Sequence, residues 1–251
     1  MCTLVILRRP GHRWPVLIGA NRDEMIDRPW KQPERHWPDR PEVVAGLDIL
    51  AGGSWLGIND WGVAAAVLNR HGSLGPSPDR RSRGELVLEA LDHADAAAAA
   101  EALSHLDPAA YRTFNLIIAD DRDGFWLRHA AGKPVELHPL KDGLSMIAAG
   151  EINDLGIRRI ELALPAFQAW PAPDPDRDDW SAWESLLGST RAPPRESDTA
   201  AMRFQTDGYG TISSALIALP DRSEPDRKAI FRFAGWQPEI APWHDIPIEA
   251  A

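Results

Sequence analysis

Residues 1–24, MCTLVILRRPGHRWPVLIGANRDE, are the stretch that decides the fold. Residues 3–8 are rich in β-branched and aliphatic side chains, and residues 15–20 form a second apolar run. The proline-glycine pair between these two runs is typical of a turn. The sequence therefore predicts that the chain opens with a β-hairpin and that the polar string NRDE, residues 21–24, lies at the end of its second strand.

Turn residues and apolar spacing predict the remaining elements. Residues 28–41 contain four prolines and mixed charges, so we expect a long surface loop there. The expected strands are residues 54–58, 62–68, 113–119, 125–127, 135–137, 144–149, 211–219 and 229–233, and the expected helices start near residues 82, 96, 153 and 180. This order predicts an α+β fold in which residues 1–251 form a single domain of two largely antiparallel sheets covered by helices.

The composition excludes several classes of protein. The chain has 37 acidic and 27 basic side chains and a formal net charge of −10, so nucleic acid is not an expected partner. One cysteine excludes an internal disulfide and a cysteine-rich zinc site, and the eight histidines lack metal-ligand spacing, so neither a metal nor a cofactor is expected. No apolar run is long enough for a signal-peptide core or a membrane span, which predicts a cytoplasmic protein.

The position of the single cysteine, Cys2, suggests a specific chemistry. Because an initiator methionine is normally removed when residue 2 is small, Cys2 is expected to become the mature N-terminus. An α-amine has a reference pKa near about 8 and a cysteine thiol near about 8.5, so the amine of the same residue can accept the thiol proton. The alternative is that Cys2 is only a small buried residue of the first strand.

Five segments occur in the order and spacing of the NRDE family, also called the transport and Golgi organisation 2 family. They are Met1-Cys2-Thr3-Leu4, Asn21-Arg22-Asp23-Glu24, Ala51-Gly52-Gly53-Ser54-Trp55-Leu56-Gly57, Phe114-Asn115-Leu116 and Tyr209-Gly210-Thr211-Ile212-Ser213-Ser214. The string NRDE is a weak motif by itself, but it is specific in combination with Cys2 and the GGSWLG segment. The resemblance extends over most of the chain.

That family resembles the N-terminal nucleophile (Ntn) hydrolases, in particular cysteine amidases such as bile-salt hydrolases and penicillin V acylases. The resemblance implies a four-layer αββα sandwich, in agreement with the two predicted sheets. It also implies that a mature N-terminal cysteine attacks a non-peptide amide, which makes Cys2 the candidate nucleophile. By the same resemblance, Asn69 is the candidate oxyanion-hole donor, and Arg22 and Asp23 surround the nucleophile.

The register of the NRDE string against the amidase pattern stays open. The amidases place their Arg and Asp three positions apart, whereas Arg22 and Asp23 are adjacent and only Asn21 and Glu24 have that spacing. Successive strand residues point to opposite faces, so we expect Arg22 and Glu24 on one face and Asn21 and Asp23 on the other. The alternative is an Arg–carboxylate pair that only fixes the end of the strand.

Two departures from the pattern bear on activity. Many family members have an Arg after Tyr-Gly-Thr, whereas this chain has Ile212, which cannot stabilise an anion. The amidases also have a second Asn, for which Asn153 is a loose match; its alternative role is to cap the following helix. Trp55 and His71 complete the candidate binding residues. The alternatives are that Trp55 only packs in the core and that His71 lies in a solvent-exposed loop.

These observations support functions of two different classes. The first is an Ntn-type hydrolase of a small amide or ester with Cys2 as its nucleophile. The second is a non-enzymatic carrier of an apolar, acyl-bearing or haem ligand in lipid or haem homeostasis, which Ile212 favours because a group for binding anions is lost. A protein-interaction role for residues 28–41 is a third interpretation. The expected partner of the first two is a small molecule, and the oligomeric state is not determined.

Overall fold

Two antiparallel sheets form the centre of the computed structural model, which describes residues 2–73, 75, 77, 79–192, 197–237 and 240–248. The first sheet has the strand order β10 (Gly143–Ile147), β1 (Thr3–Arg8), β2 (Val16–Met25), β11 (Tyr209–Leu219), β12 (Ile230–Gly235) and β13 (Ala241–Asp245). The second sheet has the order β3 (Trp30–Glu34), β4 (Val43–Asp48), β5 (Leu56–Asn59), β6 (Ala64–Asn69), β7 (Phe114–Ala119), β8 (Gly124–His129) and β9 (Val135–Pro139).

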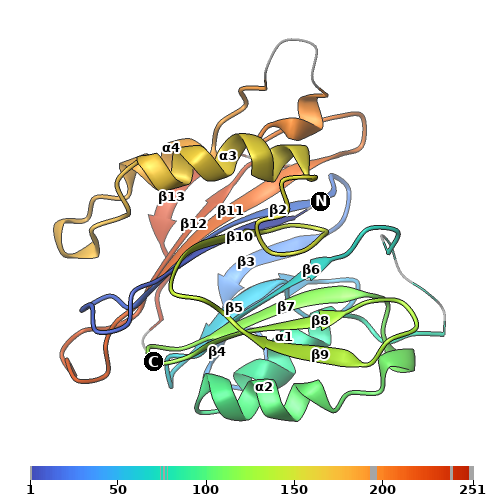
Figure 1. The fold of residues 1–251 in the computed structure, drawn as a ribbon, viewed down its shortest axis with the longest axis horizontal. Coiled ribbons are helices and arrows are strands. Elements are labelled where there is room, and N and C mark those ends of the chain that lie inside the picture. The colour runs from blue at the N-terminus through green and yellow to red at the C-terminus, as the bar shows by residue number, and fades with distance from the viewer. Residues whose placement is uncertain are drawn as a thin grey trace.

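Helices cover the outer face of each sheet (Figure 1). α3 (Arg158–Ala169) and α4 (Ser181–Leu187) lie on the first sheet, and α1 (Gly84–Leu91) and α2 (Ala96–Ser104) lie on the second. Each helix buries an apolar stripe and each sheet an apolar outer face, which is why the layers stay together. The predicted α+β fold of four layers, helix, sheet, sheet and helix, is confirmed.

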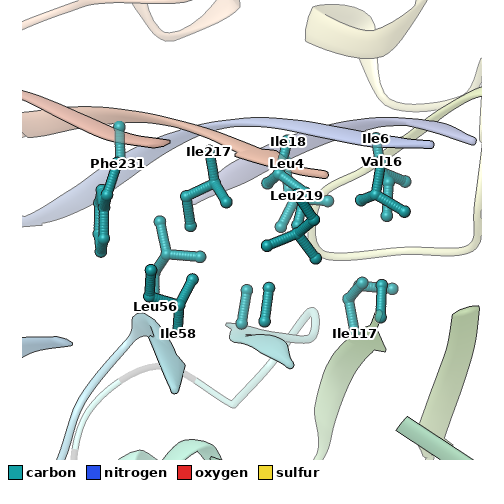
Figure 2. Packing of buried hydrophobic residues seen from close by; sticks show 14 of the residues in the cluster. Leu4, Ile6, Val16, Ile18, Leu56, Ile58, Ile117, Ile217, Leu219 and Phe231 are labelled. Atoms are coloured by element: carbon teal, nitrogen blue, oxygen red, sulfur yellow. The ribbon is translucent and has the colours of Figure 1, made fainter. Parts of the chain in front are cut away.

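The main core lies between the two sheets. Leu4, Ile18 and Ile217 point down from the first sheet and meet Leu56 and Ile117 from the second, as Figure 2 shows. Neighbouring residues of the same strands face the helices, because side chains alternate along a strand. Each buried aliphatic side chain contributes about 1.5–3 kcal/mol relative to an exposed one. This interior fixes the faces to which the polar residues near the strand ends point.

Three strands were absent from the sequence prediction. The expected loop at residues 28–41 contains β3, an edge strand in which Pro33 coincides with a shift in register against β4. β4 contains Gly46, where a Cβ atom would lie only 2.3 Å from the Trp55 ring. β13 forms the other edge of the first sheet. The prediction of one long irregular loop was therefore wrong, because a proline is tolerated at a sheet edge.

Two of the four predicted helices begin later than expected, whereas α2 and α4 begin at or next to the expected residues 96 and 180. α1 begins at Gly84 rather than near residue 82, and the Ser82 hydroxyl accepts a hydrogen bond from the Gly84 amide. α3 begins at Arg158, several residues after the expected start at 153. Within the described ranges, no helix has the length and apolar character needed to cross a membrane.

Candidate active site

Cys2 directly precedes β1 and lies beside the end of β2. Thr3, the first residue of β1, pairs with Asn21, so the hairpin register brings the thiol close to the NRDE string. The Cys2 Sγ atom donates a weak hydrogen bond to the carbonyl oxygen of Asp23 over 3.6 Å. The side chain is half-buried and packs against the core between the sheets.

A small cavity between the two sheets separates the thiol from the second sheet. Its volume of about 20 Å³ is enough for one water molecule or one small group such as a carbonyl, and too small for a whole organic ligand. The cavity is lined by side chains from both sheets, namely Cys2, Thr3, Leu4, Ala20, Asn21, Arg22, Trp55, Leu56, Ala66, Val67, Leu68, Ser213 and Ala215. We call it the Cys2 cavity.

Arg22 is the charged side chain of the Cys2 cavity. Its side chain is 4% exposed, its Nη2 atom donates to Asp48 over 3.1 Å, and its guanidinium lies 4.0 Å from the centre of the Trp55 ring. Its Nη1 atom is buried and has no hydrogen-bond partner among the described residues. A buried donor without a partner costs about 1–3 kcal/mol or more, so this atom is a candidate ligand-binding group.

Ser213 supplies a second donor of the same kind. β11 has a bulge between Thr211 and Ser213, so Ser213 pairs with Arg22 while Thr211 pairs with Asp23. Without the extra residue, side chains at positions 211 and 213 would point to the same face; the bulge places them on opposite faces. The Ser213 hydroxyl is buried, lines the Cys2 cavity and has no hydrogen-bond partner in the described part of the chain.

The opposite face of β2 carries a fully engaged polar network. The Asp23 carboxylate accepts 2.6 Å and 2.7 Å hydrogen bonds from Arg159 of α3 and from the Thr211 hydroxyl. Arg159 also donates to the Thr3 hydroxyl over 2.9 Å. The side chains of Asp23 and Arg159 are 0% and 6% exposed, so this is a buried ion pair that ties α3 to the start of β1.

The Asn21 side chain points to the same face of β2 as Asp23, towards α3 and α4. Its amide donates to the carbonyl oxygens of Leu187 and Met202, and its side-chain oxygen accepts from Ser214. The alternation expected for the NRDE string is therefore present, with Asn21 and Asp23 on one face and Arg22 on the other. Glu24 shares the Arg22 side and lies 3.9 Å from that guanidinium.

The surroundings of Cys2 favour the neutral thiol. Burial raises the pKa of Cys2, the Asp23 carboxylate raises it further, and Arg22 acts in the opposite direction. A raised pKa means that little thiolate exists at neutral pH, so attack on a carbonyl requires a base that removes the thiol proton.

The other predicted site residues lie around this centre at different places. Trp55 lines the Cys2 cavity, and its ring stacks on Arg22. Asn69 ends β6, immediately after the cavity residue Leu68, and is half-buried. His71 lines a separate hollow, described below, and its amide donates to the carbonyl of Ala149.

Asn153 has a local structural role. Its backbone φ is 54°, and its side-chain oxygen accepts from the Met146 amide over 2.7 Å while its own amide donates to the Met146 carbonyl. These two hydrogen bonds close the loop after β10. Asn153 does not cap α3, whose first turn follows Ile157.

Ile212 lies at the bulge of β11 and is fully buried. Its carbonyl oxygen accepts the amide of Trp236. An apolar side chain at this position provides no cation, so the positive charge lining the Cys2 cavity comes from Arg22.

Sequence reasoning missed Arg159 and the side chain of Ser213. Arg159 shares the buried stripe of α3 with Ala163 and Phe167, and an arginine at a core position of a helix requires a buried anionic partner. The four-residue spacing of Arg159, Ala163 and Phe167 could have indicated that Arg159 is buried. The position of Ser213 depends on a bulge, for which the sequence of β11 gives no sign.

The comparison with protein families identifies relatives over most of the chain. A profile of the family described as Transport and Golgi organisation 2 matches residues 1–224. The human Transport and Golgi organization protein 2 homolog is 37% identical over 241 residues, covering 81% of this chain and 82% of that protein. The mouse homolog is 34% identical over 146 residues, and the matched part spans only 50% of its length and 52% of this chain.

Solved structures with little sequence similarity share the fold. An N-acylethanolamine-hydrolyzing acid amidase ortholog from Caenorhabditis elegans superposes with a TM-score of 0.61 at 15% identity, covering 96% of this chain and all of that chain. Penicillin V acylase from Agrobacterium tumefaciens also gives a TM-score of 0.61, at 16% identity, covering 98% of this chain and 86% of that one. At such identities the likeness shows an Ntn-hydrolase fold and carries no activity by itself.

Proposed function

We propose that this chain, which belongs to the Transport and Golgi organisation 2 family, is an Ntn-type hydrolase that cleaves a small amide or ester with Cys2 as its nucleophile. One observation carries the proposal: the Cys2 thiol shares a 20 Å³ cavity with two buried donors, Arg22 Nη1 and the Ser213 hydroxyl, which lack partners in the described residues. The fold shared with amidases adds support.

The reaction begins when removal of Met1 leaves Cys2 with a free α-amine. The amine takes the proton of the thiol, and Sγ attacks the carbonyl carbon of the substrate. The buried Asp23 carboxylate raises the pKa of the Cys2 thiol, and the same negative charge stabilises the ammonium that forms. This arrangement supplies the base that the raised pKa of the thiol requires.

The carbonyl oxygen gains negative charge in the transition state. Arg22 Nη1 and Ser213 Oγ are the donors proposed to receive it, because both line the cavity and neither has another partner in the described part of the chain. Donors fixed in a dry site contribute several kcal/mol to such a step. Asn69, one residue beyond the cavity residue Leu68, remains a predicted further donor.

Collapse of the tetrahedral intermediate completes the first half of the reaction. The C–N or C–O bond breaks, the ammonium returns its proton to the leaving amine or alcohol, and a thioester of Cys2 remains. Water, deprotonated by the α-amine, then attacks this thioester, releases the acid and restores the thiol. Asp23 itself is held by Arg159 and Thr211, which fixes its position throughout.

The carrier alternative lacks a comparable observation at this site. A haem or an acyl chain needs several hundred Å³, whereas the apolar space between the sheets holds about 20 Å³. The cytoplasmic setting predicted from the sequence is compatible with a thiol that must stay reduced.

Intact-mass measurement and acylation by 4-nitrophenyl acetate test the proposal. We expect Met1 to be absent from the cell-made protein, and the ester to release a burst of about one nitrophenolate per chain with one acetyl group on the N-terminal peptide. The Cys2→Ala chain should show no burst. Retention of Met1, or equal acetylation of the Cys2→Ala chain, would refute the role of Cys2.

A further inference from the structure

A second, larger hollow opens at the same end of the sandwich as Cys2. β6 lines the Cys2 cavity through Ala66, Val67 and Leu68, and the chain that follows Asn69 enters the hollow with Arg70 and His71. The register of β1 with β10, continued by two residues, places Ala149 opposite Cys2, and Ala149 also lines the hollow. The Cys2 cavity and the larger hollow are therefore adjacent, both along the first sheet and along the second.

The hollow has a volume of about 610 Å³ and a basic lining. No acidic side chain is among the described residues that line it, which are Arg70, His71, Gly72, Ser73, Ser77, Arg80, Arg112, Thr113, Ala130, Ala131 and Ala149. We call it the arginine pocket. Three guanidinium groups around one hollow are unexpected in a chain with a net charge of −10.

Backbone carbonyl groups accept hydrogen bonds from two of the arginines that line the pocket. Arg80 donates to the carbonyl of Tyr111, and Arg112 donates to the carbonyls of Gly72 and Gly75. Carbonyl groups position a guanidinium but do not cancel its charge. Arg70 differs because Glu151 lies 2.5 Å from its Nη2 atom.

Arg83 does not line the arginine pocket but adds a further positive charge next to the residues that do. Its Nη1 atom donates to the carbonyl and hydroxyl of Ser73 and to the carbonyl of Thr113, both of which line the arginine pocket. Across the described ranges, no carboxylate oxygen lies within 4.0 Å of a guanidinium nitrogen of Arg80 or Arg83. The positive charges of Arg80 and Arg83 are therefore available to an anionic ligand.

Two neighbouring groups respond to this positive potential. Burial and then the charge of Arg112 lower the pKa of Arg83 to about 10. Burial lowers the pKa of His129, and the charges of Arg80 and Arg70 lower it further. Burial is the larger cause of both pKa shifts, and the neighbouring arginines add to it.

We propose that the arginine pocket binds the anionic end group, a carboxylate or a phosphate, of the molecule whose carbonyl Cys2 attacks. The proposal rests on the function proposed above only in taking that ligand to be a substrate. Guanidinium groups bind carboxylates and phosphates with two parallel hydrogen bonds, which gives both affinity and orientation. The volume admits such a group together with the adjoining part of the substrate. The preferred substrate class is therefore acidic amides, esters or thioesters.

Anion binding can be measured without catalysis in the Cys2→Ala chain. Inorganic phosphate and succinate are added separately, each against sodium chloride of equal ionic strength, and the Tm is recorded. We expect at least one of the two anions to raise the Tm, and Arg80→Gln with Arg112→Gln to abolish the rise. Phosphate alone indicates a phosphate ester, and succinate alone a carboxylate. No rise with either anion would overturn the proposal.

A distant arginine provides the matched control. Arg177 lies in the short helix Pro175–Arg177, its side chain is 83% exposed, and it carries the same charge. Arg177→Gln should leave the anion-dependent rise in Tm unchanged. A loss of the rise in the control as great as that in the Arg80→Gln, Arg112→Gln chain would mean that the anions act through overall charge, and would also overturn the proposal.

A pair of esters tests the same pocket during turnover in the chain that retains Cys2. Mono-4-nitrophenyl glutarate and 4-nitrophenyl butanoate differ mainly in one terminal carboxylate. We expect kcat/KM for the acidic ester to exceed that for the neutral ester roughly tenfold or more, and this ratio to fall towards one in Arg80→Gln. Equal values in the unaltered chain would contradict the pocket's role. Reaction with neither ester, combined with anion binding in the Cys2→Ala chain, would refute the hydrolase but keep the anion site.

Discussion

The two faces of β2 near its end differ in how their polar groups are satisfied. On the face towards α3 and α4, Asn21 and Asp23 use their side chains in short hydrogen bonds to Arg159, Thr211, Ser214 and backbone carbonyls. On the face towards the Cys2 cavity, Arg22 keeps one buried nitrogen without a partner among the described residues. The satisfied face has the features of a structural network, and the unsatisfied face those of a binding site.

This difference separates residues that one contiguous motif would group together. The NRDE string supplies both faces, so its members are expected to respond differently to substitution. Residues of the helical face should matter mainly for the stability of the fold, although the charge of Asp23 also acts on Cys2, and residues of the cavity face should matter mainly for the reactivity of Cys2. The following predictions test that division.

Arg159→Met should have the largest effect on stability. It removes the guanidinium that pairs with the fully buried Asp23 carboxylate over 2.6 Å, so we expect a loss of about 3–5 kcal/mol in the free energy of unfolding. Urea unfolding at neutral pH measures it. The double variant Asp23→Asn with Arg159→Met should recover part of the loss, because the buried side chain at position 23 is then neutral. A loss below about 1 kcal/mol in the single variant would contradict the assignment of this face to structure.

Arg22→Met should act mainly on chemistry. Asp48 keeps its 2.7 Å ion pair with Arg28, so the fold loses little, whereas the proposed oxyanion donor is removed. Acylation by 4-nitrophenyl acetate should slow about 10²–10³-fold. The pKa of Cys2 should also rise, since Arg22 lowers it. Arg28→Met removes the other partner of Asp48 and is the control; an equal slowing in that variant would refute a direct role for Arg22.

Two adjacent serines give the sharpest contrast between the faces. The Ser214 hydroxyl binds Asn21 and accepts from Trp236, so Ser214→Ala should cost about 1–3 kcal/mol of stability. Ser213→Ala removes a hydroxyl that has no partner in the described part of the chain, so its stability should stay within about 0.5 kcal/mol while acylation of Cys2 slows roughly tenfold. Thermal unfolding and burst kinetics of both variants measure this; equal stability losses would remove the distinction.

Local patterns in the sequence were sufficient for the opening hairpin and the layer order. Apolar alternation placed β1 and most of β2, and the period of two correctly assigned Asn21 and Asp23 to one face and Arg22 to the other. The two-sheet architecture followed from the order of the elements. These features depend on residues close together in the chain, which is why a single sequence reveals them.

The missing parts depend on contacts between distant segments. The Arg159 partner of Asp23 lies 136 residues away, and the face of Ser213 is set by a bulge against β2. β3 contains a proline that only its edge position tolerates. The arginine pocket joins residues of several loops that share no sequence motif. Such features need the folded chain.

The pH dependence of Cys2 alkylation tests the central claim most directly. Iodoacetamide is applied to the mature chain and to a chain with lysine inserted before Cys2, which retains the initiator methionine and so lacks the α-amine at Cys2. In the inserted chain, the raised pKa of Cys2 should confine alkylation to pH values above the usual range of a thiol. We expect the mature chain to react at least tenfold faster at pH 7. Identical pH profiles for the two chains would contradict an N-terminal nucleophile.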